Sequence, residues 1–99
     1  MSYSVNWTLK AKKAFAQNLE YLFDEWNITV ANKFIDRVDE VILKIRENPF
    51  LYPIHSPNTG IRKCILNERI LLFYEVIDDS TIDIITFWNT YQNPDKLEF

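Results

Sequence analysis

The apolar residues of this 99-residue chain change their spacing near its middle. From Ala11 to Ile45 they recur at steps of three and four, which is the spacing of the buried face of an α-helix. From Ile61 to Trp88 they form shorter runs rich in Ile, Leu and Phe, which is typical of β-strands. Helical and strand patterns thus occupy separate parts of the chain, and this segregation predicts an α+β fold.

Two helices are expected in the first half, after a short strand over Tyr3–Trp7. Thr8 can cap the first helix, Asn27 can end it in a left-handed conformation, and Thr29 can cap the second. The second helix is expected to end at Asn48, because a residue before proline avoids the helical region. A connection of about two residues makes the pair an antiparallel hairpin. The apolar stripes comprise Ala11, Ala14, Phe15, Leu19, Leu22, Phe23 and Trp26, then Ala31, Phe34, Val38, Val41, Ile42 and Ile45.

Three strands are expected in the second half, over Ile61–Leu66, Ile70–Ile77 and Thr81–Trp88. The short connections between them favour β-hairpins and therefore an antiparallel meander. The first strand must pair with this meander to bury its apolar face. We therefore expect one domain over residues 1–99, with an antiparallel sheet of about four strands in the order β-α-α-β-β-β. The helix hairpin is expected to pack on one face of that sheet.

The composition excludes several classes of protein. A single Cys, Cys64, and a single His, His55, leave no disulfide framework and no His/Cys metal set, so neither metal nor cofactor is expected. A net charge of −3 opposes passive adhesion to nucleic acid. The chain has no apolar run near the ~18–20 residues that span a bilayer, and its start does not resemble a signal peptide. A cytoplasmic protein with no membrane partner is expected.

Two strand residues are interpreted as core residues. Cys64 stands beside Lys63, whose charge would favour a reactive thiolate, but cysteine is among the residue types most often buried. Strict alternation would put Trp88 on the same face as Ile82 and Ile84, and therefore in the core.

The basic residues of the meander are candidates for phosphate binding. Alternation puts Arg62 and Lys63 on opposite faces of the sheet, and Arg69 lies at the following turn. Guanidinium groups bind phosphate through paired N–H donors, although a solvated sheet face accounts for the same pattern. Tyr91 lies beyond the last strand, where it could stack on a base, donate a proton, or anchor the tail.

Four apolar residues fit neither helical stripe. Leu9, Ile28, Phe50 and Ile54 are candidates for a partner-binding surface, because exposed apolar groups often mark an interface. The alternative is that they close the ends of the core. The edge strands of the sheet are a second candidate interface, since an unpaired edge invites strand addition.

Several sequence strings, in this order and at this spacing, resemble the RelE/ParE family of bacterial toxins. They are Val5-Asn6-Trp7 followed by Ala11 and Ala14, then Ile45 to Pro53, Ile61 to Leu66, Leu71 to Val76, Ile82 to Ile85, and Phe87 to Pro94. The resemblance covers nearly the whole chain. It implies the toxin half of a type II toxin–antitoxin, or plasmid-stabilisation, module, with an antitoxin that wraps a segment around the toxin.

The resemblance implies one of two mechanisms, and they can be distinguished by the residues at particular positions. RelE-like members cleave mRNA on the ribosome without a metal, using basic side chains, whereas ParE-like members inhibit DNA gyrase. RelE-like chains usually carry an Arg where this chain has Leu71, and many relatives carry an Arg where it has Tyr91. Leucine cannot offer paired donors to a phosphate.

We therefore expect a ParE-like growth inhibitor with gyrase as its target by family analogy. The alternative is a RelE-like, metal-independent endoribonuclease with a rearranged catalytic set of Arg62, Arg69 and Tyr91. A second alternative is a non-toxic member that only binds its antitoxin. The residues expected to bind the target or the antitoxin are Lys63, Leu9, Ile28, Phe50 and Ile54.

Overall fold

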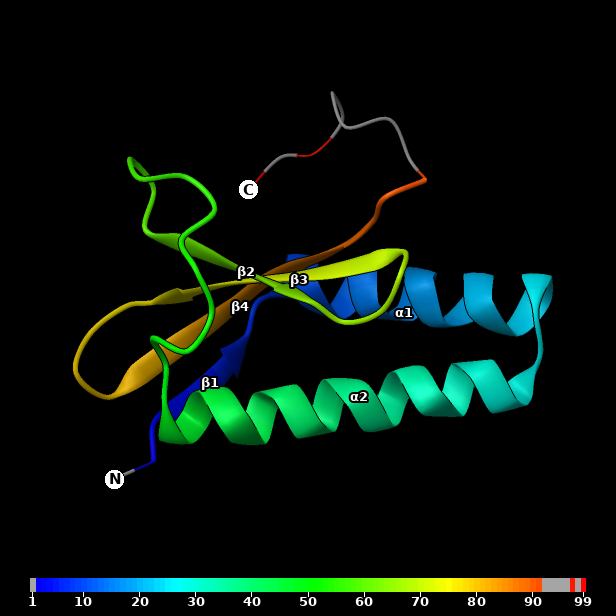
Figure 1. Ribbon diagram of the computed structural model, residues 1–99, viewed down its shortest axis with the longest axis horizontal. Helices are drawn as coiled ribbons and strands as arrows, with labels where there is room; N and C mark the ends of the chain where they lie inside the picture. Colours follow the sequence, from blue (N-terminus) through cyan, green and yellow to red (C-terminus); the bar gives the residue numbers. More distant parts are fainter. Residues whose placement is uncertain (1, 92–96, 98) are drawn as a thin grey trace.

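The computed structural model describes residues 2–91, 97 and 99 and has two layers (Figure 1). Two helices form an antiparallel hairpin that covers one face of a four-stranded sheet. The elements follow the expected order, β-α-α-β-β-β. The Gln92-Asn93-Pro94 part of the family-like string lies outside the described residues.

The sheet is mixed, so the prediction of a fully antiparallel sheet was wrong at its first strand. The strands are β1 (Ser4–Trp7), β2 (Ile61–Ile65), β3 (Ile70–Val76) and β4 (Thr81–Asn89), in the spatial order β1-β4-β3-β2. The meander is antiparallel as expected, but β1 lies parallel to β4. A parallel pair requires a long crossover, and the helix hairpin between β1 and the meander supplies one.

The helices are α1 (Leu9–Glu25) and α2 (Ile28–Glu47). Thr8 caps α1 as predicted, because its hydroxyl accepts the backbone N–H of Ala11. Asn27 is not left-handed. It is the N-cap of α2, with extended backbone and a side-chain oxygen that accepts the N–H of Val30 at 3.0 Å, so Thr29 is not the cap. Asn27 thus separates the two helices and caps the start of α2, and no left-handed residue is needed between them.

A β-bulge in β4 overturns the expected position of Trp88. Phe73 pairs with Thr86, but the next residue of β3 pairs with Ile84, so Ile85 is an extra residue. The extra residue reverses the alternation beyond it, which places Phe87 on the helix side and the half-buried Trp88 on the other face. The hydroxyl of Thr8 donates to the carbonyls of Ile84 and Ile85 at 2.7 and 3.2 Å, and this ties the bulge to the start of α1.

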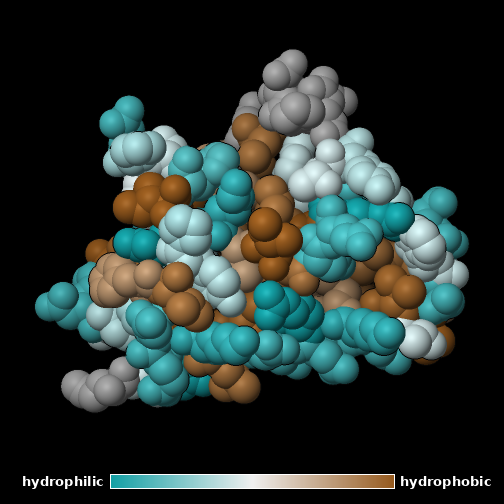
Figure 2. Space-filling view, viewed as in Figure 1, coloured by the Kyte–Doolittle hydropathy of each residue, from teal (hydrophilic) through white to brown (hydrophobic). Residues whose placement is uncertain are grey.

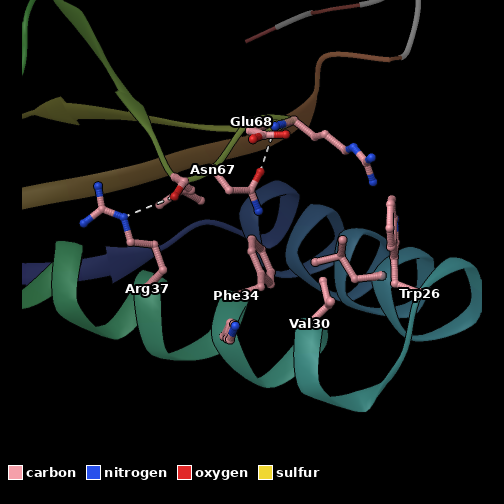
Figure 3. Close-up of a pocket in the computed structure, with 10 residues that line it drawn as sticks. Trp26, Val30, Phe34, Arg37, Asn67 and Glu68 are labelled. Atoms are coloured by element: carbon pink, nitrogen blue, oxygen red, sulfur yellow. Dashed lines mark hydrogen bonds between the residues drawn. The ribbon is translucent and has the colours of Figure 1, made fainter.

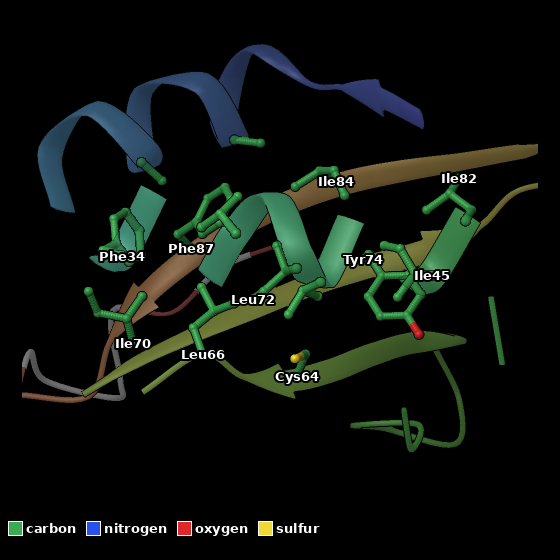
Figure 4. Packing of buried hydrophobic residues seen from close by; sticks show 14 of the residues in the cluster. Phe34, Ile45, Cys64, Leu66, Ile70, Leu72, Tyr74, Ile82, Ile84 and Phe87 are labelled. Atoms are coloured by element: carbon green, nitrogen blue, oxygen red, sulfur yellow. The ribbon is translucent and has the colours of Figure 1, made fainter. Parts of the chain in front are cut away.

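The core lies between the sheet and the helix hairpin (Figure 4). Its aromatic centre joins one ring from β1, one from each helix and one from β4. Phe87 lies with ring centroids 5.4 Å from Trp7, 5.6 Å from Phe15 and 6.3 Å from Phe34. Rings at these separations add specific contacts to the burial of large apolar surfaces.

The opposite face of the sheet has a smaller apolar contact of its own. Phe73 is fully buried there, although it lies outside the main core. The ring of His55, from the loop before β2, lies 5.0 Å from Phe73, and the ring of Phe99 lies 4.8 Å from it. His55 is thus a packing residue on this face.

The far end of the helix hairpin extends past the sheet (Figure 1). The apolar stripe of α1 predicts that Phe23 and Trp26 are buried, yet they are 56% and 50% exposed. The stripe continues to the end of the helix, but the strands do not reach that far. Apolar surface is therefore left uncovered at this end, and the candidate site lies there.

Candidate functional site

An apolar groove of about 510 Å³ lies between the end of α1, the start of α2 and the β2–β3 turn (Figure 3). We call it the helix-end groove. Its lining residues are Leu22, Trp26, Val30, Lys33, Phe34, Arg37, Leu66, Asn67, Glu68 and Arg69. In Figure 2 brown apolar surface shows between the two helices at the right of the view, with teal polar residues around it. The floor of the groove is thus apolar and its rim is charged.

The β2–β3 turn is held in place by hydrogen bonds on both of its sides. The side-chain oxygen of Asn67 accepts the N–H groups of Arg69 and Ile70 at 2.8 and 2.9 Å, which is the turn geometry that asparagine favours. The carbonyl of Arg69 accepts the N–H of Thr90, just beyond β4, at 2.6 Å. Arg69 therefore projects from a fixed backbone.

Two aromatic rings hold the Arg69 side chain at the rim of the groove. Its guanidinium carbon lies 4.2 Å from the ring centre of Trp26 and 4.9 Å from that of Tyr91, which are cation–π distances. We call this arrangement the Arg69 clamp. Within residues 2–91, 97 and 99, no carboxylate lies within ion-pair distance of Arg69. The clamp thus orients a guanidinium without neutralising it.

Arg37 connects α2 to the end of β2. It donates to the carbonyls of Leu66 at 3.2 Å and Ile65 at 3.3 Å, and it pairs with Glu40 at 3.2 Å. Glu40 also accepts from Lys44 at 2.8 Å, and the hydrogen bond from Lys44 is the main reason that the Glu40 pKa lies below its usual value. Arg37 is thus largely committed to holding the groove wall.

The outer edge of β2 is covered by the protein's own chain, contrary to the expectation of an open edge. The N–H of His55 donates to the carbonyl of Ile61 at 2.7 Å, and the N–H of Lys63 donates to the carbonyl of Pro53 at 3.0 Å. Arg37 covers the carbonyl of Ile65 further along. These contacts leave little room for strand addition at this edge.

The structure separates the three residues of the predicted catalytic set. Arg69 and Tyr91 lie together, but Arg62 pairs with Tyr74 in the sheet, four positions along β3 from Ile70. Four strand residues span roughly 13 Å. Arg62 donates to the Tyr52 carbonyl at 2.8 Å and lies 5.0 Å from the ring centre of Phe50. The two arginines therefore do not converge.

The five residues predicted to bind a partner do not form one surface. Ile28 is 61% exposed where α2 begins, and Phe50 is 58% exposed beyond the end of α2. Leu9 begins α1, and Ile54 forms a bridge with Arg62 in the loop before β2; both side chains are exposed. Lys63 lies opposite Phe73, on the face away from the helices.

Cys64 has the geometry of a buried structural residue. Its side chain is fully buried in the core, and burial is the main cause that raises the pKa of its thiol. Nucleophilic attack requires an accessible thiolate, and both conditions are unmet here.

Alkylation by iodoacetamide tests this interpretation. We expect Cys64 of the folded protein to react roughly tenfold or more slowly than after unfolding in urea, since modification requires local opening. The reaction can be followed by mass spectrometry at one pH in both states. Equal rates in the two states would show that the thiol is accessible in the fold.

Among the described residues, no group of three or more His, Cys, Asp or Glu side chains is placed to hold a metal ion. Within the same residues, no helix is both long and apolar enough to cross a membrane.

Sequence reasoning did not identify the helix-end groove. It assigned Trp26 to the apolar stripe of the first helix and Phe34 to that of the second, and it did not consider Lys33 and Arg37. Two signals were available: an aromatic residue directly after α1, and two cations spaced four apart on α2 beside the stripe. Neither reveals by itself that the sheet stops short of the helix ends.

Known protein families and solved structures were compared with this chain in sequence and in fold. The family model described as the ParE toxin of the type II toxin–antitoxin system, parDE, matches residues 5–94. No sequence among the curated proteins matches this chain.

Solved structures share the fold at low sequence identity. The chain is similar to a structure of the chromosomal ParDE toxin–antitoxin system from P. aeruginosa, with a TM-score of 0.72, 17% identity, and coverage of 89% of this chain and 96% of that one. A YoeB dimer from Staphylococcus aureus gives a TM-score of 0.62, 21% identity, and coverage of 89% and 97%. The RelBE2 toxin–antitoxin complex from Mycobacterium tuberculosis gives 0.60, 16%, and coverage of 90% and 99%.

Proposed function

Because the chain belongs to the family of ParE toxins of type II toxin–antitoxin systems, we propose that it inhibits growth by binding a macromolecular target. By family analogy that target is DNA gyrase in the cytoplasm. An antitoxin neutralises the protein by forming a complex with it. No chemical step on a substrate is required in this mechanism.

The observation that carries the proposal is the separation of the cationic side chains. Metal-independent cleavage of RNA needs basic groups around one phosphate, because they must stabilise the charge that develops there. Arg62 is bound to the Tyr52 carbonyl, and Arg69 is clamped beyond the other end of β3. Leu71, where RelE-like chains usually carry an arginine, lies opposite Trp88 in the sheet and supplies no charge.

The antitoxin partner is supported by what the structural neighbours assemble with. The neighbours include a ParDE system, a RelBE2 complex and a YoeB–YefM heterotetramer from Staphylococcus aureus. A toxin–antitoxin hetero-oligomer is therefore proposed for this chain as well. Exposed apolar surface at the helix-end groove is consistent with a partner that covers it.

One observation favours the second candidate, a ribosome-dependent endoribonuclease. Arg69 and Tyr91 lie in contact, with ring centre and guanidinium carbon 4.9 Å apart, so a cation and a phenol are available together. A nuclease built on this pair would lack Arg62, and it would work with two groups rather than three.

Induction of this chain alone in a bacterial host tests the proposal. DNA and protein synthesis are followed by labelled precursors in the same culture, with the empty vector as control. We expect DNA synthesis to fall first, because a gyrase inhibitor blocks replication before translation. Purified protein is then expected to inhibit supercoiling by gyrase directly.

The two alternatives predict different results in the same cultures. An early fall in protein synthesis that is abolished by both Arg69→Ala and Tyr91→Phe would favour the endoribonuclease. No change in either synthesis rate, with folded protein present, would leave antitoxin binding as the protein's role.

A further inference from the structure

We propose that the helix-end groove binds a partner segment in which apolar side chains adjoin Asp or Glu, and that Arg69 receives a carboxylate of that segment. The inference rests on the proposed antitoxin partner, and it specifies where the partner docks and by which chemistry.

The floor of the groove is apolar and therefore favours apolar side chains in a bound segment. Leu22, Phe34 and Leu66 are buried beneath it, while Val30 is half-buried and Trp26 is half-exposed at its margin. A groove between two helices accepts the apolar face of an amphipathic segment, which gains from burial without backbone pairing. Figure 3 shows Trp26, Val30 and Phe34 along one side of this space.

The charge on the rim selects acidic neighbours. Three cations, Lys33, Arg37 and Arg69, and one carboxylate, Glu68, line the groove in a chain whose net charge is −3. Glu40 pairs with Arg37, and Lys33 and Arg69 keep the rim positive. The local charge is thus opposite to that of the whole protein. Complementary charge of this kind fixes orientation and excludes basic partners.

Arg69 is the group prepared to make the contact. The rings of Trp26 and Tyr91 restrict its guanidinium, so little side-chain freedom remains to be lost when a ligand binds. Stacking uses the faces of a guanidinium, whereas its N–H donors lie in the plane and match a carboxylate. Arg37, in contrast, already donates to Glu40 and to two backbone carbonyls.

The neighbouring strand edge favours a groove over strand addition. At Ile61, Lys63 and Ile65 the outer edge of β2 already bonds to the loop before it or to Arg37. A segment that reaches this end of the molecule therefore gains more from the groove than from pairing with β2.

Selection of random short peptides displayed on phage tests the inference on the intact protein. We expect the enriched peptides to combine Leu, Ile or Phe with Asp or Glu, and their binding to weaken as NaCl is raised. Affinities are then measured by fluorescence anisotropy with the enriched peptides made synthetically.

Four variants locate the binding. Arg69→Glu in the clamp and Val30→Glu in the groove are each expected to weaken binding roughly tenfold or more, because one loses the carboxylate contact and the other introduces a charge. Arg69→Lys keeps the charge but loses the paired donors, so it should fall between Arg69→Glu and the wild type. Leu43→Glu is the matched control for Val30→Glu, since Leu43 also lies on α2, is 61% exposed and does not line the groove.

Circular dichroism and urea unfolding of each variant separate lost binding from lost folding. Enriched peptides that bind Arg69→Glu and Val30→Glu as well as they bind the wild type would overturn the inference. Enrichment of basic peptides, or of none that depend on the groove, would overturn it too.

The binding assay does not depend on toxicity, so the two proposals can fail separately. If the protein leaves DNA synthesis unchanged but binds acidic, apolar peptides in the groove, only the gyrase proposal is refuted. A chain that blocks DNA synthesis but binds no such peptide refutes the groove proposal alone.

Discussion

Replacing Phe87 by alanine is expected to lower the free energy of unfolding by about 3–5 kcal/mol. Phe87 is 2% exposed and contacts rings from β1, α1 and α2, so its removal leaves a cavity that no single element can close. Domains of this size are stable by only about 5–15 kcal/mol in total. The variant should therefore be partly unfolded at temperatures where the wild type is intact.

Phe23→Ala is the matched control for this prediction. It also replaces phenylalanine by alanine, but Phe23 lies on α1 and is 56% exposed. The free energy of unfolding is therefore expected to fall by less than about 1 kcal/mol. Urea unfolding followed by tryptophan fluorescence measures both, since Trp7 stacks on Phe87. Equal losses in the two variants would mean that the aromatic cluster is not the centre of the core.

The stability of the protein is expected to fall above about pH 10, because the folded structure buries Tyr74 in its protonated, neutral form. The side chain is fully buried, its O–H donates to the Pro49 carbonyl at 2.8 Å, and burial raises the pKa of Tyr74 to about 12. An unfolded tyrosine has a pKa of about 10, so between these values the unfolded chain releases a proton that the folded protein retains. The contribution of Tyr74 to the free energy of unfolding is fully present below about pH 10, and roughly 2–3 kcal/mol is lost by about pH 12.

Tyr74→Phe isolates this contribution. At neutral pH the free energy of unfolding of the variant should be about 1 kcal/mol lower than that of the wild type, because the hydrogen bond is removed. Above about pH 10 its stability should decline less steeply than that of the wild type. Burial also raises the pKa of Tyr52, but that group is present in both proteins and cancels in the comparison. Parallel curves for the wild type and Tyr74→Phe would contradict the prediction.

Local patterns predicted most of the secondary structure, because each depends on neighbours in the sequence. The helical stripes located α1 and α2, Thr8 marked the start of α1, and the short turns determined the antiparallel meander. Asn27 was assigned the wrong end of a helix, because asparagine is suited both to left-handed C-caps and to N-caps. Sequence alone could not choose between these two uses.

The candidate site was less predictable, because it depends on distances between elements. Arg69 and Tyr91 were identified as candidates from their residue types, but their contact with each other and with Trp26 arises only where three elements meet. Arg62 carries the same charge, yet it is held by the loop after α2. Residue type indicates what a side chain can bind, and the fold decides what lies near it.

The sequence by itself determined the class of fold, the order of its elements and the family, because periodicity, capping residues and short turns act over a few residues. Only the tertiary structure decided the parallel pairing of β1, the side on which Trp88 lies, and the groove beside Arg69. The first depends on the direction in which β1 meets β4, the second on a single extra residue in β4, and the third on how far the helices extend past the sheet. Local patterns do not encode such offsets, since they are set when the helix hairpin packs against the sheet as a whole.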